Sequence, residues 1–147
     1  MNEKEKAIIA LLEERNMLLY DVLSITEPIK FHKDDVEKYV ELMDARQVKF
    51  DRLEVISEEL TDLEFDQAQA ETEGSVEFQK TAEDLYNAGR ATVYRIREID
   101  LSHKPMIEEI RINFTEQLKT VNERKNARNL YSDDNMPQGG RFFNKTK

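Results

Sequence analysis

Apolar residues recur every three or four positions through almost the whole chain, and this spacing limits the fold to helices. It is regular from Ile8 to Ile29, from Val36 to Leu63, and again from Phe78 to Val121. Each run therefore predicts an apolar stripe along one face of a helix. The chain contains only 4 Gly and 3 Pro, the residues that most often interrupt helices. We expect an all-α fold, an elongated antiparallel bundle or coiled coil of three to four long helices.

Capping and breaking residues mark where these helices should begin and end. Asn2 followed by Glu5 fits an N-terminal capping box. Pro28 predicts that the first helix kinks or ends nearby, and Asp34 is the expected N-cap of the second helix. A loop is expected at about residues 66–76, which are acidic and rich in small residues, before the third helical run.

Four residues depart from the character of the stripes that contain them. Arg46 is a polar break that either fixes helix register or packs its stem while its head reaches water. Gly89 costs about 1 kcal/mol relative to Ala in a helix, so it indicates a closely passing helix unless it is merely tolerated. His103 is expected to be partly buried with its hydrogen bonds satisfied. Pro105 permits either one kinked helix or a break between two helices, and we favour the continuous, kinked helix.

The last residues of the chain have a different composition from the helical body. Residues 132–147 hold two of the four glycines and end with the aromatic pair Phe142 and Phe143. They are too polar and too rich in turn-formers to continue a helix. We predict a helical bundle at 1–131 and a flexible C-terminal tail at 132–147. The tail is either a disordered terminus or an arm whose two aromatic rings occupy the chain's own apolar groove.

Composition and charge argue against several classes of protein. Cysteine is absent, which excludes disulfides and thiolate chemistry. The net charge is −9, and residues 1–77 hold 9 Lys and Arg against 21 Asp and Glu, so nucleic-acid binding is disfavoured. No run approaches the roughly 20 apolar residues that cross a bilayer, and the N-terminus does not resemble a secretion signal. We expect a cytoplasmic protein that does not insert into membranes.

Motifs for catalysis or for cofactor binding do not occur in the sequence. No nucleophile motif, phosphate-binding loop or zinc spacing is present, so we expect neither an enzyme nor a cofactor. His32 lies near Asp34 and Asp35. In a capping loop such residues more often serve as a cap than as metal ligands, and no metal site is expected.

The final helical run offers the best candidate surface for a partner. Its stripe should stay packed internally as far as Val121, after which the seam positions become Lys125 and Arg128. Apolar residues then return at the end of the run, where they either pack on the N-terminal helix or extend an open stripe. An open stripe can accept an amphipathic helix of another protein. The candidate partner-binding residues are Ile110, Phe114, Leu118, Val121, Leu130 and Tyr131.

Two parts of the sequence resemble a known family. The segment "IREIDLSHKPMIEEIRINFTEQLKTVNERKNARNLY", followed by a polar spacer and "GGRFFNKTK", resembles the C-terminal half of the flagellar type III export chaperones. The segments "LLEERNMLLYDVLSITEPI" and "VEKYVELMDARQVKFDRLEVISEEL" are similar to the leading leucine-rich hairpin of that family. The agreement covers most of the chain as a pattern of helix lengths, charge and ending.

The resemblance implies an all-α, cytoplasmic, non-enzymatic protein with a defined client. Members hold secreted flagellar subunits, the hook-associated or filament-cap proteins, and deliver them to the export apparatus. By the same resemblance the candidate residues from Ile110 to Tyr131 lie in the segment that receives the client's terminal helix. Tyr131 also matches the place of a family tyrosine implicated in docking to the export gate.

A second function is compatible with the same patterns. The chain could be a coiled-coil scaffold whose stripes only join copies of itself, with no secreted client. Its acidic first half and basic second half suit either an intramolecular hairpin or a head-to-tail dimer. A homodimer is therefore left open by the sequence.

Overall fold

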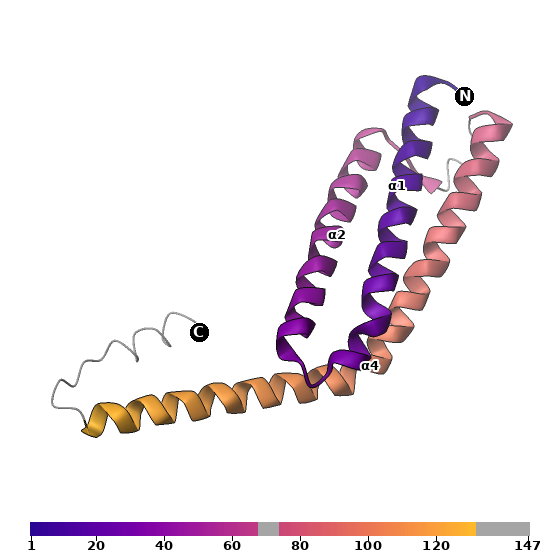
Figure 1. Cartoon of the computed structure of the whole chain (residues 1–147). Coiled ribbons are helices and arrows are strands. Elements are labelled where there is room, and N and C mark those ends of the chain that lie inside the picture. The colour runs from indigo at the N-terminus through magenta and orange to yellow at the C-terminus, as the bar shows by residue number, and fades with distance from the viewer. Residues whose placement is uncertain (68–73, 132–147) are drawn as a thin grey trace. The chain divides into compact units, whose positions relative to one another are not determined.

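The regular structure of the chain is helical throughout the part that can be described. The computed structural model describes residues 1–67 and 74–131, except for the side chain of Tyr131. The elements there are α1 (Glu3–Thr26), the 3₁₀-helix η1 (Glu27–His32), α2 (Val36–Asp62) and α4 (Val76–Tyr131). Figure 1 labels the three α-helices. These two ranges contain no strand, which confirms the all-α prediction. The chain divides into two compact units, Met1–Lys104 and a second that begins at Pro105.

The first helix begins and ends where local chemistry requires. The Oδ1 of Asn2 accepts a hydrogen bond from the backbone N–H of Glu5 at 2.7 Å, and the Oε1 of Glu5 accepts one from the N–H of Asn2 at 3.1 Å. This confirms the predicted capping box. α1 ends at Thr26, and Pro28 lies in the first turn of η1. Proline fits there because the missing amide would have no partner in a first turn.

The second helix is capped one residue later than the sequence predicts. Asp35, not Asp34, is the N-cap of α2, and its Oδ1 accepts from the backbone N–H of Lys38 at 3.0 Å. The two neighbouring residues carry the same carboxylate, and only the backbone geometry decides which one reaches the amide. At the other end, Glu64 has a φ of 57°. The backbone N–H of Phe65 then donates to the carbonyl of Leu60 at 3.0 Å, which closes the end of α2.

α4 begins at Val76, and a contact from α1 fixes its start. The Oε2 of Glu5 accepts hydrogen bonds from both the backbone N–H and the hydroxyl of Ser75, each at 3.2 Å. Gly74 precedes this contact with a φ of +93°, and a Cβ on it would lie 2.9 Å from the Phe78 ring. A side chain there would be strained as well as crowded. The predicted loop at about residues 66–76 therefore ends where expected, although its residues 68–73 lie outside the described ranges.

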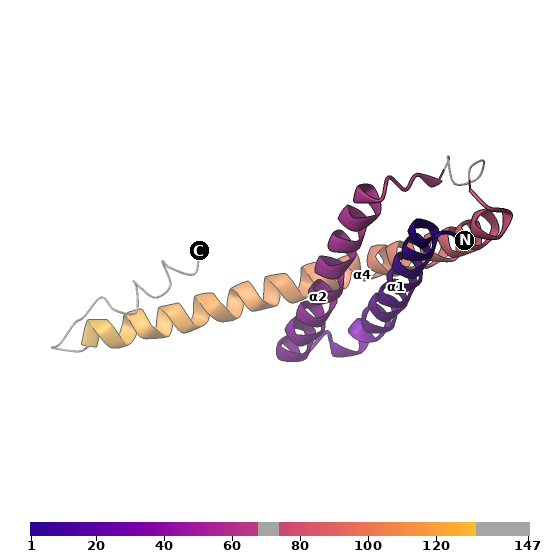
Figure 2. The same ribbon diagram turned by 90° about the horizontal axis from the view of Figure 1, so that it is seen from above.

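Within the first unit, three helices pack around two apolar clusters. The beginning of α1 meets the end of α2 and the beginning of α4 in the first cluster, while the end of α1 takes part in the second. α2 therefore runs in the opposite direction to α1 and to this part of α4 (Figure 1, Figure 2). Full burial of a Leu or Ile side chain contributes about 1.5–3 kcal/mol, so these clusters dominate the stability of the unit. The buried residues are Ile8, Ile9, Leu12, Ile56, Leu60, Phe78 and Ala82 in the first cluster, and Leu19, Val22 and Ile96 in the second.

Gly89 lies where α1 and α4 approach closely. A Cβ at this position would lie 2.4 Å from the Oδ1 of Asn16 and 3.6 Å from the Cδ1 of Leu19. Asn16 is held in place because its Nδ2 donates to the backbone carbonyl of Leu85 at 2.8 Å. The interpretation of Gly89 as the site of a closely passing helix is confirmed.

α4 continues through Pro105 without a break. This confirms a continuous helix rather than two separate ones. α4 has 56 residues, whereas α1 has 24 and α2 has 27.

Candidate partner-binding surface

Three apolar residues of α4 form an exposed line beyond Pro105. Phe114, Leu118 and Val121 have exposed fractions of 45%, 44% and 43%. They are separated by steps of four and three, so their side chains lie on one face of the helix. We call these three residues the apolar row. All three belong to the set that the sequence predicts as partner-binding.

Burial along α4 ends earlier than the sequence predicts. Ile107 is half-buried and Ile110 is only 4% exposed, whereas every residue from 111 to 121 is exposed. The expectation that internal packing continues to Val121 is therefore wrong. The exposed residues belong to the second unit, which begins at Pro105, whereas both apolar clusters lie in the first unit. Ile110 precedes Phe114 by four residues, but its side chain is buried, so it does not belong to the exposed apolar row.

The remaining predicted residues do not extend the row. Leu130 is 80% exposed, but it follows Val121 by nine residues and lies about 180° around the helix from it. Ile112 is also exposed, and it lies about 200° from Phe114. Tyr131 is the last residue of α4, and its side chain lies outside the described part. Phe142 and Phe143, and the tail that carries them, are also outside it.

Basic residues continue the face of the apolar row at both ends. Arg111 precedes Phe114 by three residues, and Lys125 and Arg128 follow Val121 by four and seven. Residues at these steps lie on the same face. Arg111 also forms an ion pair with Glu108 at 2.6 Å. The face thus has an apolar centre between cationic ends, which suits a partner helix with apolar and acidic residues.

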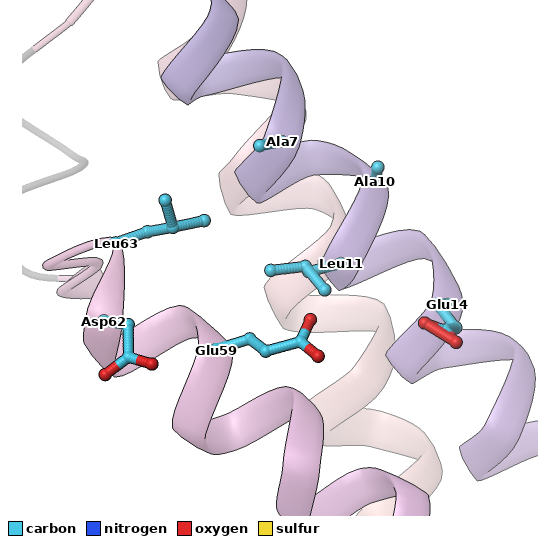
Figure 3. A pocket seen from close by; sticks show the side chains of 7 residues that line it. All are labelled: Ala7, Ala10, Leu11, Glu14, Glu59, Asp62 and Leu63. Carbon is cyan, nitrogen blue, oxygen red and sulfur yellow. The ribbon is translucent and has the colours of Figure 1, made fainter.

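A second surface feature lies between α1 and α2 within the first unit. It is a groove of about 510 Å³, and Leu11 and Leu63 face one another across it in Figure 3. Both leucines have the spacing of core residues, but each is only half-buried. The one sequence signal for the groove is the neighbouring pair of small residues on α1, which leave space that larger side chains would fill. We call this feature the α1–α2 groove; its lining residues are Ala7, Ala10, Leu11, Glu14, Glu59, Asp62 and Leu63.

The rim of the α1–α2 groove is acidic, and one arginine partly compensates it. The guanidinium of Arg52 donates to Glu14 at 2.8 and 2.9 Å and to Glu59 at 3.4 Å. The hydrogen bonds from Arg52 lower the pKa of Glu14, so this carboxyl stays ionised at neutral pH. Asp62 lies one turn beyond Glu59 at the end of α2, where it is exposed. Asp62 is therefore the one carboxylate of this lining that Arg52 does not bind.

His103 is buried in the first unit, beside a strong ion pair. Burial lowers its pKa, and Asp100 acts in the opposite direction. Its side chain is 5% exposed, so it is buried more fully than the partial burial that the sequence predicts. The predicted satisfaction of its hydrogen bonds is wrong for Nδ1, which has no partner among the described residues. The nearby carboxylate of Asp100 is already bound by Arg46 at 2.8 and 2.6 Å.

The described ranges contain neither a candidate metal site nor a membrane-spanning helix. No group of three His, Cys, Asp or Glu residues in residues 1–67 and 74–131 is arranged to hold a metal ion. Asp35, which lies near His32 in the sequence, instead caps α2. No helix in the same ranges is long and apolar enough to cross a bilayer.

Comparison with known proteins found no relative of this chain. No family model matches the chain, and neither a curated protein nor a solved structure matches it.

Proposed function

We propose that this chain is a helix-binding protein that receives an amphipathic helix of a partner along the apolar row of α4. The observation that carries the proposal is the exposure of Phe114, Leu118 and Val121 on one face between basic residues. An amphipathic helix reads such a surface through apolar residues at three- and four-residue spacing. Acidic residues on the partner helix would pair with Arg111, Lys125 and Arg128.

The size of the apolar row favours reversible binding. Full burial of side chains of this kind contributes about 1.5–3 kcal/mol each, and about half of each is already covered, so the row adds roughly 2–4 kcal/mol. Association must also offset the lost freedom of the two molecules. The row alone therefore supports a weak complex, and additional contacts must come from the charged ends. A protein that holds a client and later releases it benefits from this balance.

The narrower proposal is that the protein is a flagellar export chaperone of the cytoplasm. The resemblance of residues 96–131 and of the two N-terminal segments to that family supports it. The client would be a hook-associated or filament-cap subunit, which the chaperone delivers to the export apparatus. In this proposal the elongated antiparallel bundle is the frame that presents α4, and Tyr131 contributes to docking at the export gate. Phe142 and Phe143 would occupy the apolar surface until a client arrives.

Binding of a client helix to matched variants tests the proposal. A labelled helical peptide from the C-terminus of a hook-associated subunit would be titrated with the full chain and followed by fluorescence anisotropy. The variant with Phe114→Ser, Leu118→Ser and Val121→Ser should bind at least about tenfold more weakly, because roughly 2–4 kcal/mol of apolar burial is lost. The matched control is Ile112→Ser with Leu130→Ser, which removes exposed apolar residues from the other side of the same helix. Equal binding by both variants would refute the assignment of the site.

The second candidate function is a self-associating coiled-coil scaffold without a client. The division of charge between an acidic first half and a basic second half favours it. Co-expression with hook-associated subunits distinguishes the two candidates. A stable one-to-one complex supports the chaperone, whereas a homo-oligomer that ignores every subunit supports the scaffold.

A further inference from the structure

Two surfaces of the same chain match each other in character and in length. The α1–α2 groove has an apolar floor and an acidic rim, while the face of the apolar row has an apolar centre and basic ends. The α1 side of the groove extends from Ala7 to Glu14, and the apolar row extends from Phe114 to Val121. Each covers seven residue steps, or about 10 Å along a helix.

The shapes of the two surfaces are also compatible. Ala7 and Ala10 have small side chains and leave room along α1. Leu11 and Leu63 face one another from opposite sides of the groove. A large side chain such as Phe114 can pack beside alanines, because helices interlock by placing the ridges of one into the grooves of the other. Docking would then remove from water both the partly exposed Leu11 and Leu63 and the side chains of the apolar row. Burial of apolar surface on both molecules supplies the favourable free energy of association.

Charge fixes how the two surfaces align. At one end of the groove, Glu14 and Glu59 already share Arg52. At the other end stands Asp62, at the end of α2. The face of the apolar row has two basic residues beyond Val121, namely Lys125 and Arg128, and only Arg111 before Phe114. The end with two cations should therefore meet the Asp62 end of the groove.

We propose that the apolar row of one copy docks in the α1–α2 groove of a second copy, and that the exchange is reciprocal. Each copy has one row and one groove, so two copies related by a twofold axis satisfy all four surfaces. The contact places Phe114, Leu118 and Val121 over Leu11 and Leu63. The occupant of the groove is thus a second copy of this chain.

This dimer goes beyond the proposed function and does not depend on it. It requires no client, but it covers the apolar row that a client helix would use. The free chain is a dimer with its row protected from other apolar surfaces, and client binding requires the dimer to dissociate. Failure of client binding would leave the dimer intact, and absence of a dimer would leave the client site open.

Sedimentation equilibrium of the full chain, over a range of protein concentrations and at low and high salt, tests the proposal. The expected result is a monomer–dimer equilibrium that salt weakens, because exposed charges are screened. Asp62→Lys should raise the dimer dissociation constant by at least about tenfold, since it replaces attraction with repulsion in both reciprocal contacts. The paired variant Lys125→Glu with Arg128→Glu should have the same effect from the other surface.

Mixing the two charge-reversed proteins provides the decisive measurement. In the mixed dimer, the lysine introduced at position 62 of one copy faces the glutamates introduced at positions 125 and 128 of the other, while the second contact keeps its native charges. Dimerisation should return in the mixture although each protein alone is weakened. Asp62→Lys should leave the fold intact, because a cation is favoured at a helix C-terminus, and circular dichroism checks the helical content of both variants. A monomer at every concentration, a dimer that neither reversal weakens, or a mixture that does not recover would each overturn the proposal.

Discussion

The guanidinium of Arg46 on α2 binds the carboxylate of Asp100 on α4 at two points, with N–O distances of 2.8 and 2.6 Å. The side chain of Arg46 is 10% exposed and that of Asp100 is 37% exposed. The guanidinium also lies 5.0 Å from the centre of the Phe50 ring. Of the two roles predicted for Arg46, the structure supports the fixing of helix register, because a two-point ion pair holds α2 and α4 at one relative position.

The unequal burial of this ion pair predicts unequal effects of removing its members. Asp100→Ala leaves a buried guanidinium without its acceptor and should lower the free energy of unfolding by about 2–3 kcal/mol. Arg46→Met leaves a carboxylate that water can reach and should cost about 1–2 kcal/mol. Urea denaturation of the two variants measures both values.

A more exposed ion pair between two helices provides the control for this comparison. Lys49 and Asp21 lie 3.4 Å apart with side chains 36% and 50% exposed. Lys49→Met should change the free energy of unfolding by less than about 1 kcal/mol. If Arg46→Met proved more damaging than Asp100→Ala, the argument from burial would be wrong.

Gly89 and Asn16 form a second pair with a measurable coupling. Gly89→Ala should gain about 1 kcal/mol of helix propensity. Its Cβ would, however, lie 2.4 Å from the Oδ1 of Asn16. Asn16 must then move and lose its hydrogen bond to the carbonyl of Leu85, so the variant should be less stable than the wild type by about 1 kcal/mol.

The same substitution should become favourable when Asn16 is shortened. In the Asn16→Ala background the crowding atom is absent, and Gly89→Ala should then raise the free energy of unfolding. Thermal unfolding of the four proteins of this double-mutant cycle gives the coupling. A Gly89→Ala effect of the same sign in both backgrounds would show that the two residues are independent.

Glu5 connects the first turn of α1 to the start of α4, and this contact predicts an acid-sensitive stability. The backbone hydrogen bond from Asn2, followed by the bonds from Ser75, lowers its pKa below the ordinary value of 4.5, although burial acts against this. The ionised carboxylate is therefore favoured in the folded state. Its contribution is present above the unfolded-state pKa and is lost as the pH falls through the lower folded-state value.

The test is urea denaturation of Glu5→Gln between about pH 6 and pH 3. The variant should lose part of the stability gap to the wild type as the pH decreases, because protonation abolishes the same contact in the wild-type protein. Glu3→Gln is the matched control, since Glu3 lies in the same first turn and is exposed. A constant gap between Glu5→Gln and the wild type across this range would contradict the assignment.

The periodicity of the sequence was sufficient to predict the helices and the capping box at Asn2, because both depend on residues close together in the chain. The N-cap of α2 was displaced by one residue because Asp34 and Asp35 offer the same group. Gly89 could be interpreted only when α1 was placed against α4. Periodicity identifies a stripe, but it does not state which neighbour covers it.

The candidate site shows the same division between local and tertiary information. The stripe from Ile107 to Val121 was visible in the sequence, but the point where burial stops was not, because burial depends on contacts between residues far apart in the chain. The α1–α2 groove was missed because Leu11 and Leu63 have the spacing of core residues and are covered only in part. Small residues beside them, Ala7 and Ala10, were the one available signal, and alanine is too common in helices to identify a groove.

His103 supplies a prediction in a pH range separate from that of Glu5. Burial lowers its pKa from the ordinary 6.5, the positive charges of Lys30 and Arg46 act in the same direction, and the carboxylate of Asp100 opposes them. The neutral imidazole is therefore favoured in the folded protein, while the unfolded chain binds a proton at about pH 6.5. The free energy of unfolding should be highest above pH 6.5 and should fall as the pH decreases from about 7.5 towards the lower folded-state pKa. His103→Gln should lose this fall and His32→Gln should retain it, as measured by urea denaturation at a series of pH values. If stability instead rose on acidification in the wild type and not in His103→Gln, the attraction of Asp100 would outweigh the burial of the imidazole, and His103 would be charged in the folded state.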